Sequence, residues 1–111
     1  MKPIQQERLN GINLDFVDKV RRFEFIQEDL EVSLLIVADY YEGGEVNLNI
    51  EGVQLLKIPD TGASRPLSFG ELFIDDLRGD GLESVSYRIF DELTGFNCEC
   101  REFDIKLHNN N

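Results

Sequence analysis

The chain has 111 residues, which fits one domain, and its apolar fraction of 41% is typical of a folded globular protein rather than a disordered one. Twenty-two acidic residues against eleven basic ones give a formal net charge of −11. This excess argues against nucleic acid and anionic membranes as partners, because both are bound by basic surfaces. A basic protein would be attracted by the field of the acidic surface, and we expect any partner to be of this kind. The alternative is that the acidity only keeps the protein soluble.

Residues 1–10 show no apolar periodicity, and they predict a loose lead-in. They also lack the apolar segment of a signal peptide. The longest apolar run, residues 34–38, is far too short to span a membrane. We therefore expect a cytoplasmic protein.

Residues 12–22 fit two different local structures. The alternation of apolar and polar residues over 12–16 favours a short strand. A competing short helix would run from Asp15, as its N-cap, to Arg22, with Phe16, Val17 and Val20 as its apolar stripe. Periodicity alone leaves both open.

The β pattern becomes stronger from Phe23 onward. Residues 32–38 are apolar at almost every position, which predicts a central strand covered on both faces. The pair Gly43-Gly44 predicts a hairpin loop, and residues 46–51 alternate as in a strand with one buried face. At Gly52 the parity of the apolar positions changes, which indicates a β-bulge or a sharp bend.

The second half continues in the same manner after a loop over residues 59–66. Strands are predicted over 69–75, 85–89, 96–100 and 103–107, with turns at 76–81 and 91–95 and a bulge near Arg101 and Glu102. About seven or eight short strands favour a mainly β fold, either an antiparallel β-sandwich or a strongly curled antiparallel sheet, with at most one short N-terminal helix. We expect a single domain over residues 1–111, with loose tails at 1–10 and 108–111. The predicted core consists of Phe23, Phe25, Leu34, Ile36, Leu48, Ile50, Tyr87, Ile89, Phe96 and Phe103.

Residues able to support catalysis are scarce. The single histidine, His108, lies in the polar C-terminal tail. Cys98 and Cys100 alternate within a strand, where they are too close along the chain for a mutual disulfide and are best interpreted as buried apolar residues. The acidic turn at 75–83 does not have the ligand spacing of an EF-hand. We therefore predict no catalytic residue, no cofactor and no metal.

The acidic residues gather in the predicted turns, in one case beside two tyrosines. A tyrosine offers contact area together with a hydrogen-bonding tip, which suits protein recognition. A structural alternative is that Tyr40 ends a strand and packs on the core while Tyr41 flanks a turn. The candidate partner-binding residues are Tyr40, Tyr41, Glu42, Glu45, Asp75, Asp76, Asp80 and Glu83.

These features predict a non-catalytic acidic protein-interaction domain. The alternative is a small ligand-binding or hydrolytic β-sandwich that uses loop carboxylates. Formation of a homodimer through an exposed edge strand is compatible with either function.

Three segments carry a resemblance to a known class of proteins: residues 46–58, 81–91 and 96–105. Together they resemble small bacterial immunity-type domains and related uncharacterised β-rich domains, with a strand, a glycine-valine step, a variable loop and a closing pair of strands. The resemblance implies an inhibitor that binds a cognate toxin and has no catalysis of its own. Because the chain is acidic, that toxin would be basic.

Overall fold

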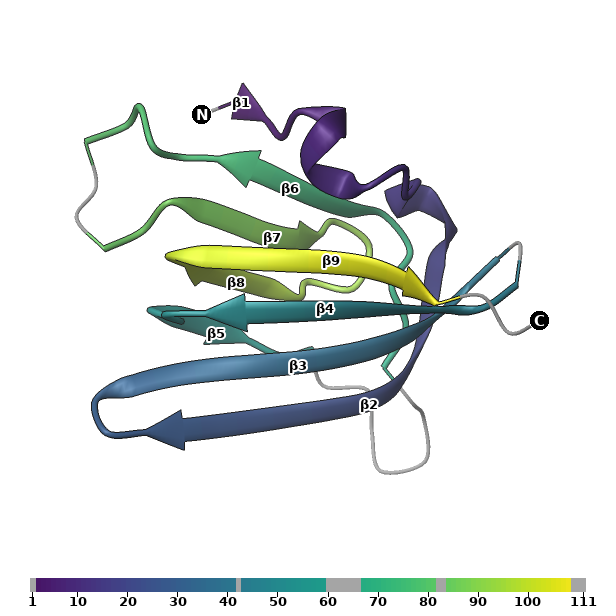
Figure 1. The fold of residues 1–111 in the computed structure, drawn as a ribbon, viewed down its shortest axis with the longest axis horizontal. Helices are drawn as coiled ribbons and strands as arrows, with labels where there is room; N and C mark the ends of the chain where they lie inside the picture. The colour runs from purple at the N-terminus through teal and green to yellow at the C-terminus, as the bar shows by residue number, and fades with distance from the viewer. Residues whose placement is uncertain (1, 42, 60–66, 82–83, 109–111) are drawn as a thin grey trace.

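The computed structural model describes residues 2–41, 43–59, 67–81 and 84–108. Within these ranges the chain forms nine strands in two antiparallel sheets that face each other (Figure 1). The five-stranded sheet has the order β1-β6-β7-β8-β5, from Lys2–Pro3, Leu72–Asp76, Tyr87–Asp91, Asn97–Cys100 and Leu55–Lys57. The four-stranded sheet has the order β2-β3-β4-β9, from Val17–Glu28, Glu31–Tyr40, Glu45–Glu51 and Glu102–His108. The prediction of a mainly β, antiparallel, sandwich-like fold is confirmed.

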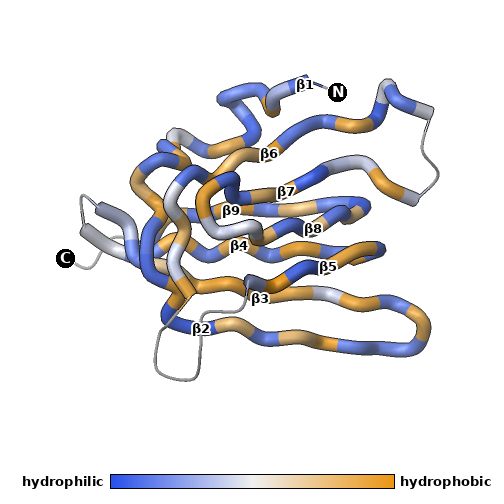
Figure 2. The backbone as a smooth tube through the Cα atoms, turned by 180° about the vertical axis from the view of Figure 1, so that it is seen from behind, coloured by the Kyte–Doolittle hydropathy of each residue, from blue (hydrophilic) through white to orange (hydrophobic). Residues whose placement is uncertain are grey.

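The core lies between the sheets and follows the alternation of the strands, which is visible along the tubes of Figure 2. Of the predicted core residues, Phe23 is only partly buried and Phe25 is 56% exposed, so its assignment to the core was wrong. Phe25 lies opposite Leu34 in the β2–β3 register, close to the hairpin that extends past β5 (Figure 1). The opposing sheet does not cover it there. The confirmed core residues are Leu34, Ile36, Leu48, Ile50, Tyr87, Ile89, Phe96 and Phe103.

Strand β3 is central in its sheet but is not covered on both faces, contrary to the prediction. Its even-numbered residues from Leu34 to Tyr40 are buried, whereas Leu35 and Val37 are only half-buried. The sandwich has two layers, so the outer face of β3 lies toward solvent. There Leu35 lies opposite Glu24 of β2 and Val37 lies opposite Arg22.

The two changes of parity in the sequence are the two points where the chain passes between the sheets. After β4 the chain turns at Gly52 and enters β5 of the other sheet, and after β8 it turns at Arg101 and returns as β9. The N–H of Arg101 donates to the carbonyls of both Glu51 and Gly52, each at 3.1 Å. Both predicted irregularities are therefore sharp bends that lie against each other.

The N-terminal segment is structured, which corrects the expectation of a loose lead-in. Strand β1 pairs with β6, and a 3-10 helix, η1 (Gln6–Leu9), buries Leu9 in the core. Figure 1 shows this segment running along one edge of the sandwich beside β6.

Neither local structure expected for residues 12–22 is formed. Asn13 accepts the N–H of Asp15 and begins a single 3-10 turn, η2 (Leu14–Phe16), after which the chain enters β2 at Val17. Pairing with β3 therefore overrides the weak helical pattern. No helix in the described part of the chain is long and apolar enough to span a membrane.

The predicted C-terminal tail, residues 108–111, and the predicted loop, residues 59–66, are only partly described by the structure. His108 is the last residue of β9, opposite Glu45, so it belongs to a strand rather than to a tail. Residues 109–111, and residues 60–66 of the predicted loop, lie outside the described residues.

Candidate functional site

The predicted partner-binding residues fall into two groups at opposite ends of the molecule. Tyr41 and Glu45 flank the β3–β4 hairpin, whereas Asp75 and Asp76 end β6 and Asp80 follows in its turn (Figure 1). The structure therefore does not combine them into one surface. Glu42 and Glu83 lie outside the described residues.

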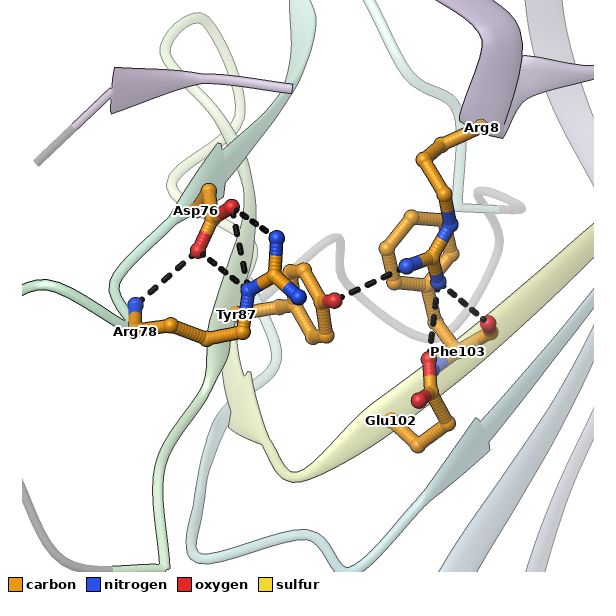
Figure 3. Close-up of polar contacts among 6 residues, drawn as sticks. All are labelled: Arg8, Asp76, Arg78, Tyr87, Glu102 and Phe103. Atoms are coloured by element: carbon orange, nitrogen blue, oxygen red, sulfur yellow. Dashed lines mark hydrogen bonds and ion pairs between the residues drawn. The ribbon is translucent and has the colours of Figure 1, made fainter. Parts of the chain in front are cut away.

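Asp76 is bound by Arg78 of the same chain (Figure 3). Nη2 of Arg78 lies 2.7 Å from Oδ2 of Asp76, and the backbone N–H of Arg78 donates to Oδ1 at 2.9 Å. Hydrogen bonds from the Arg78 side chain and backbone lower the pKa of Asp76 from 3.8 to about 2. A carboxylate with so low a pKa is a weak proton acceptor near neutral pH. Asp76 is therefore poorly suited to act as the general base of a hydrolytic sandwich.

Beside this pair, Arg8 connects the N-terminal segment to both sheets (Figure 3). Its Nη1 donates to the hydroxyl of Tyr87 on β7 at 2.9 Å, and its Nη2 donates to Oε1 of Glu102 on β9 at 2.8 Å. The guanidinium carbon lies 5.2 Å from the ring centroid of Tyr87 and 4.9 Å from that of Phe103. On the other side Arg78 lies 5.5 Å from the Tyr87 ring centroid. These contacts hold the sandwich together at this end.

The other two acidic residues of this end differ in burial. Burial raises the pKa of Asp75, which is half-buried and opposite Arg88 in the β6–β7 register. Asp80 is exposed, and its N–H donates to the carbonyl of Leu77 within the turn. Asp75 thus lies on a strand, as predicted, and Asp76 is the last residue of the same strand rather than part of the predicted turn.

The two tyrosines at the opposite end have separate roles. Tyr40 is buried at 8% exposure, and its hydroxyl accepts the N–H of Asn13 at 2.9 Å. It therefore supports the fold and is not available to a partner. Tyr41 is 80% exposed, and its N–H donates to the carbonyl of Phe16 at 2.8 Å. The rings of Tyr41 and Phe16 lie 5.5 Å apart between centroids, tilted by 47°.

Tyr41 is part of an open depression of about 300 Å³, here called the Tyr41 depression and lined by Asp15, Phe16, Val17, Asp18, Tyr41 and Phe69. Val17 and Phe69 are buried and form its floor, whereas Phe16 is half-buried and Tyr41 stands exposed at its side. Asp15 and Asp18 are exposed, and no ion pair among the described residues involves either of them. The depression therefore combines aromatic walls with two carboxylates open to a ligand.

Backbone contacts assemble the Tyr41 depression from three distant segments. The turn η2 presents Asp15 and Phe16, and the residues before β6 join β2 through the N–H of Phe69, which donates to the carbonyl of Asp18 at 3.1 Å. Sequence reasoning found Tyr41 but missed the other lining residues, because no local pattern brings residues 15–18, 41 and 69 together.

Glu45 and its neighbour Asp39 contribute further negative charge near the hairpin. Asp39 is held by Arg21, whose Nη2 lies 2.7 Å from Oδ2, and this hydrogen bond lowers the pKa of Asp39. Glu45 is half-buried at the start of β4. It lies close enough to Arg21 to raise the pKa of that guanidinium slightly, behind the larger effect of Asp39.

The remaining reactive side chains do not form a site with the Tyr41 depression. Cys98 and Cys100 are fully buried, and burial raises the pKa of each thiol to about 12. Such thiols are protonated and behave as small apolar core residues. His108 is exposed at the end of β9, in the other sheet from Cys98. Within the part of the chain that the structure describes, no three His, Cys, Asp or Glu side chains gather as metal ligands.

Comparisons of this chain with protein-family models, with curated proteins and with solved structures found no match. The resemblance to immunity-type domains therefore stays a prediction.

Proposed function

We propose that this chain is a non-catalytic interaction domain that binds a basic protein, with a lysine or arginine side chain of the partner seated in the Tyr41 depression. The observation that carries the proposal is the exposed ring of Tyr41 beside Phe16, with the open carboxylates of Asp15 and Asp18 lining the same depression.

Three physical effects favour a basic side chain at this place. Aromatic faces attract an ammonium or guanidinium group within about 6 Å of the ring centroid, by about 0.5–1 kcal/mol at exposed sites. The carboxylates supply opposite charge. The aliphatic stem of lysine or arginine packs on apolar surface, which Phe69 and Val17 offer at the floor.

The charge of the whole chain supports the same class of partner. A net charge of −11 accelerates the encounter with a basic protein, and added salt screens that attraction. An immunity-type inhibitor of a basic toxin is one protein that works in this way, and it is the biological role we propose for the domain.

The proposal can be tested by mapping backbone amide shifts of the labelled protein during titration with a short capped lysine peptide, Gly-Lys-Gly. We expect saturable shifts that are concentrated at residues 15–18, 41 and 69 and that weaken as salt is added. A capped Gly-Glu-Gly peptide is the matched control and should produce no such shifts. Shifts scattered over the acidic surface, or equal shifts with both peptides, would overturn the proposal.

A further inference from the structure

The strand edges of the sandwich are not equally protected. At the edge formed by β9, side chains of the N-terminal segment cover the backbone: Nδ2 of Asn10 donates to the carbonyl of Ile105 at 2.8 Å, and Arg8 lies 3.5 Å from the carbonyl oxygen of Phe103. The first part of β2 is also covered, because the N–H of Val20 donates to the carbonyl of Leu67 at 2.9 Å. Covered edges of this kind prevent pairing with other chains.

The second part of β2, from Arg21 to Glu28, is different. Among the described residues this stretch pairs with β3 and with no strand on its other side. Figure 1 shows it along the outer edge of the four-stranded sheet, and Figure 2 shows hydrophobic segments along this edge and at the hairpin tip. Phe25 is 56% exposed and Ile26 is 40% exposed. A long edge strand with exposed apolar side chains is a template for strand addition.

The charges of this stretch are divided along its length. Arg21 and Arg22 lie at its start, Glu24 lies near its middle, and Glu28 lies at its end, so the first half carries the net positive charge. Two copies of the strand in antiparallel orientation would therefore place the basic half of each copy opposite the acidic half of the other. Opposite charges across such a pair stabilise it, and like charges destabilise it.

From this self-complementarity we propose that two copies of the chain associate by antiparallel pairing of their β2 edges around a two-fold axis at Phe25. The axis is perpendicular to the joined sheet, so residues that face the core side in one copy lie opposite core-side residues in the other. Phe25 then meets Phe25 of the partner subunit, and Arg22 lies opposite Glu28 of the partner subunit.

The neighbouring registers that keep the faces matched are less favourable. An axis at Glu24 places that carboxylate opposite Glu24 of the partner subunit, and an axis at Ile26 places Glu24 opposite Glu28 of the partner subunit. Both bring like charges together. In the register centred on Phe25, Arg22 exchanges its contact with Glu24 of its own strand for one with Glu28 of the partner subunit.

The pairing is independent of the proposed basic partner, because it uses the hairpin end of β2 and not the Tyr41 depression. Its test is the molar mass of the full chain by light scattering from about 10 μM to about 1 mM, a range that detects modest affinities. We expect a dimer that forms reversibly with concentration. A wild-type chain that is monomeric over the whole range would overturn the proposal.

Four single variants and one double variant test the pairing and its register. Phe25→Lys is expected to raise the dissociation constant about tenfold or more, whereas Leu93→Lys, at another exposed apolar residue, should leave it unchanged. Arg22→Glu and Glu28→Arg should each weaken dimerisation, and the double variant should restore it because both pairs are reversed. The four substituted side chains are exposed at the surface, so each variant is expected to fold, and circular dichroism checks that it does. Pairing at β2 would be contradicted if Phe25→Lys left the dissociation constant of the dimer unchanged. It would also be contradicted if the double variant dimerised as weakly as the two single variants.

Discussion

Arg8 and Tyr87 lie 79 positions apart in the sequence, yet a hydrogen bond of 2.9 Å joins the guanidinium to the phenol hydroxyl. Arg8 belongs to the N-terminal turn η1 and Tyr87 to β7, while the same guanidinium also binds Glu102 of β9. One side chain thus connects both sheets to the N-terminus. Together with the β1–β6 pairing and the burial of Leu9, this contact accounts for the regular structure of residues 2–10, which have no apolar periodicity.

Replacing Arg8 by Ala should lower the free energy of unfolding by about 1–3 kcal/mol, because it removes two side-chain hydrogen bonds and the cation–π contacts with Tyr87 and Phe103. Lys106→Ala is the matched control, since it breaks an exposed ion pair with Asp104 and should change stability by less than about 0.5 kcal/mol. Urea denaturation measures both values. Equal effects of the two substitutions would show that Arg8 does not hold the sheets together.

A second structural prediction concerns Asp91, whose buried carboxylate accepts four backbone N–H groups. Oδ2 accepts from Gly70 at 2.6 Å and Glu71 at 3.1 Å, and Oδ1 accepts from Leu93 at 2.9 Å and Thr94 at 3.0 Å. In Asp91→Asn, one oxygen becomes an NH₂ group that faces two donors. We expect a loss of about 2–4 kcal/mol in the free energy of unfolding.

Glu92→Gln makes the same chemical change at the adjacent, exposed residue and is the control for Asp91. It should leave the thermal unfolding midpoint almost unchanged, whereas Asp91→Asn should lower it by several degrees. If both variants had the same thermal unfolding midpoint, the hydrogen bonds accepted by the Asp91 carboxylate would not stabilise this loop.

The bend between the sheets gives a third prediction. Gly52 has φ +64°, and a Cβ built there would lie 2.8 Å from Cβ of Arg101. Gly52→Ala should therefore cost about 1–3 kcal/mol, from backbone strain and displacement of the facing chain. Gly79→Ala is the control, because a Cβ at Gly79 would meet no atom within 4 Å. Chemical denaturation should show a larger loss in the free energy of unfolding for Gly52→Ala than for Gly79→Ala. A Gly52→Ala variant as stable as the wild type would contradict the close approach of the two chain segments.

Asp76 gives a pH-dependent prediction. Its folded-state pKa of about 2 lies below the ordinary value of 3.8, so the ionised form is favoured by folding. The contribution to stability is complete above about pH 4 and disappears as the pH falls toward about 2. The free energies of unfolding of the wild type and of Asp76→Asn, measured by denaturation, should therefore differ near pH 7 and become nearly equal near pH 2. If the difference in the free energy of unfolding were the same at both pH values, the ion pair with Arg78 would not be the source of that difference.

The parts of the fold that were predictable from sequence are those that depend on local pattern. Alternation along residues 46–51 and 96–100 gave strands with the correct buried faces, and the parity changes at Gly52 and Arg101 marked real bends. The sequence did not reveal that these bends are crossings between sheets, since a bulge and a crossing change parity in the same way.

The errors came from contacts between distant residues. Asp91 looks like an ordinary acidic turn residue until Gly70 and Glu71 are brought to it, and Phe25 fits a core pattern although the opposing sheet does not cover it. Within the candidate site, the exposed tyrosine was predictable but its setting was not. The neighbours of Tyr41 in the depression come from residues 15–18 and 69, which only the tertiary fold places there.

The central claim, recognition of a basic side chain at the Tyr41 depression, is tested most directly by comparing two charge-neutralising double variants. Asp15→Asn with Asp18→Asn removes the carboxylates of the depression, whereas Glu51→Gln with Glu92→Gln removes the same charge from exposed residues elsewhere. The measurement is the affinity of each for the capped lysine peptide. We expect the first pair to weaken binding about threefold to tenfold, as for two exposed ion pairs, and the second pair to weaken it less than about twofold. Equal weakening by both would mean that binding depends only on net charge and would contradict the account.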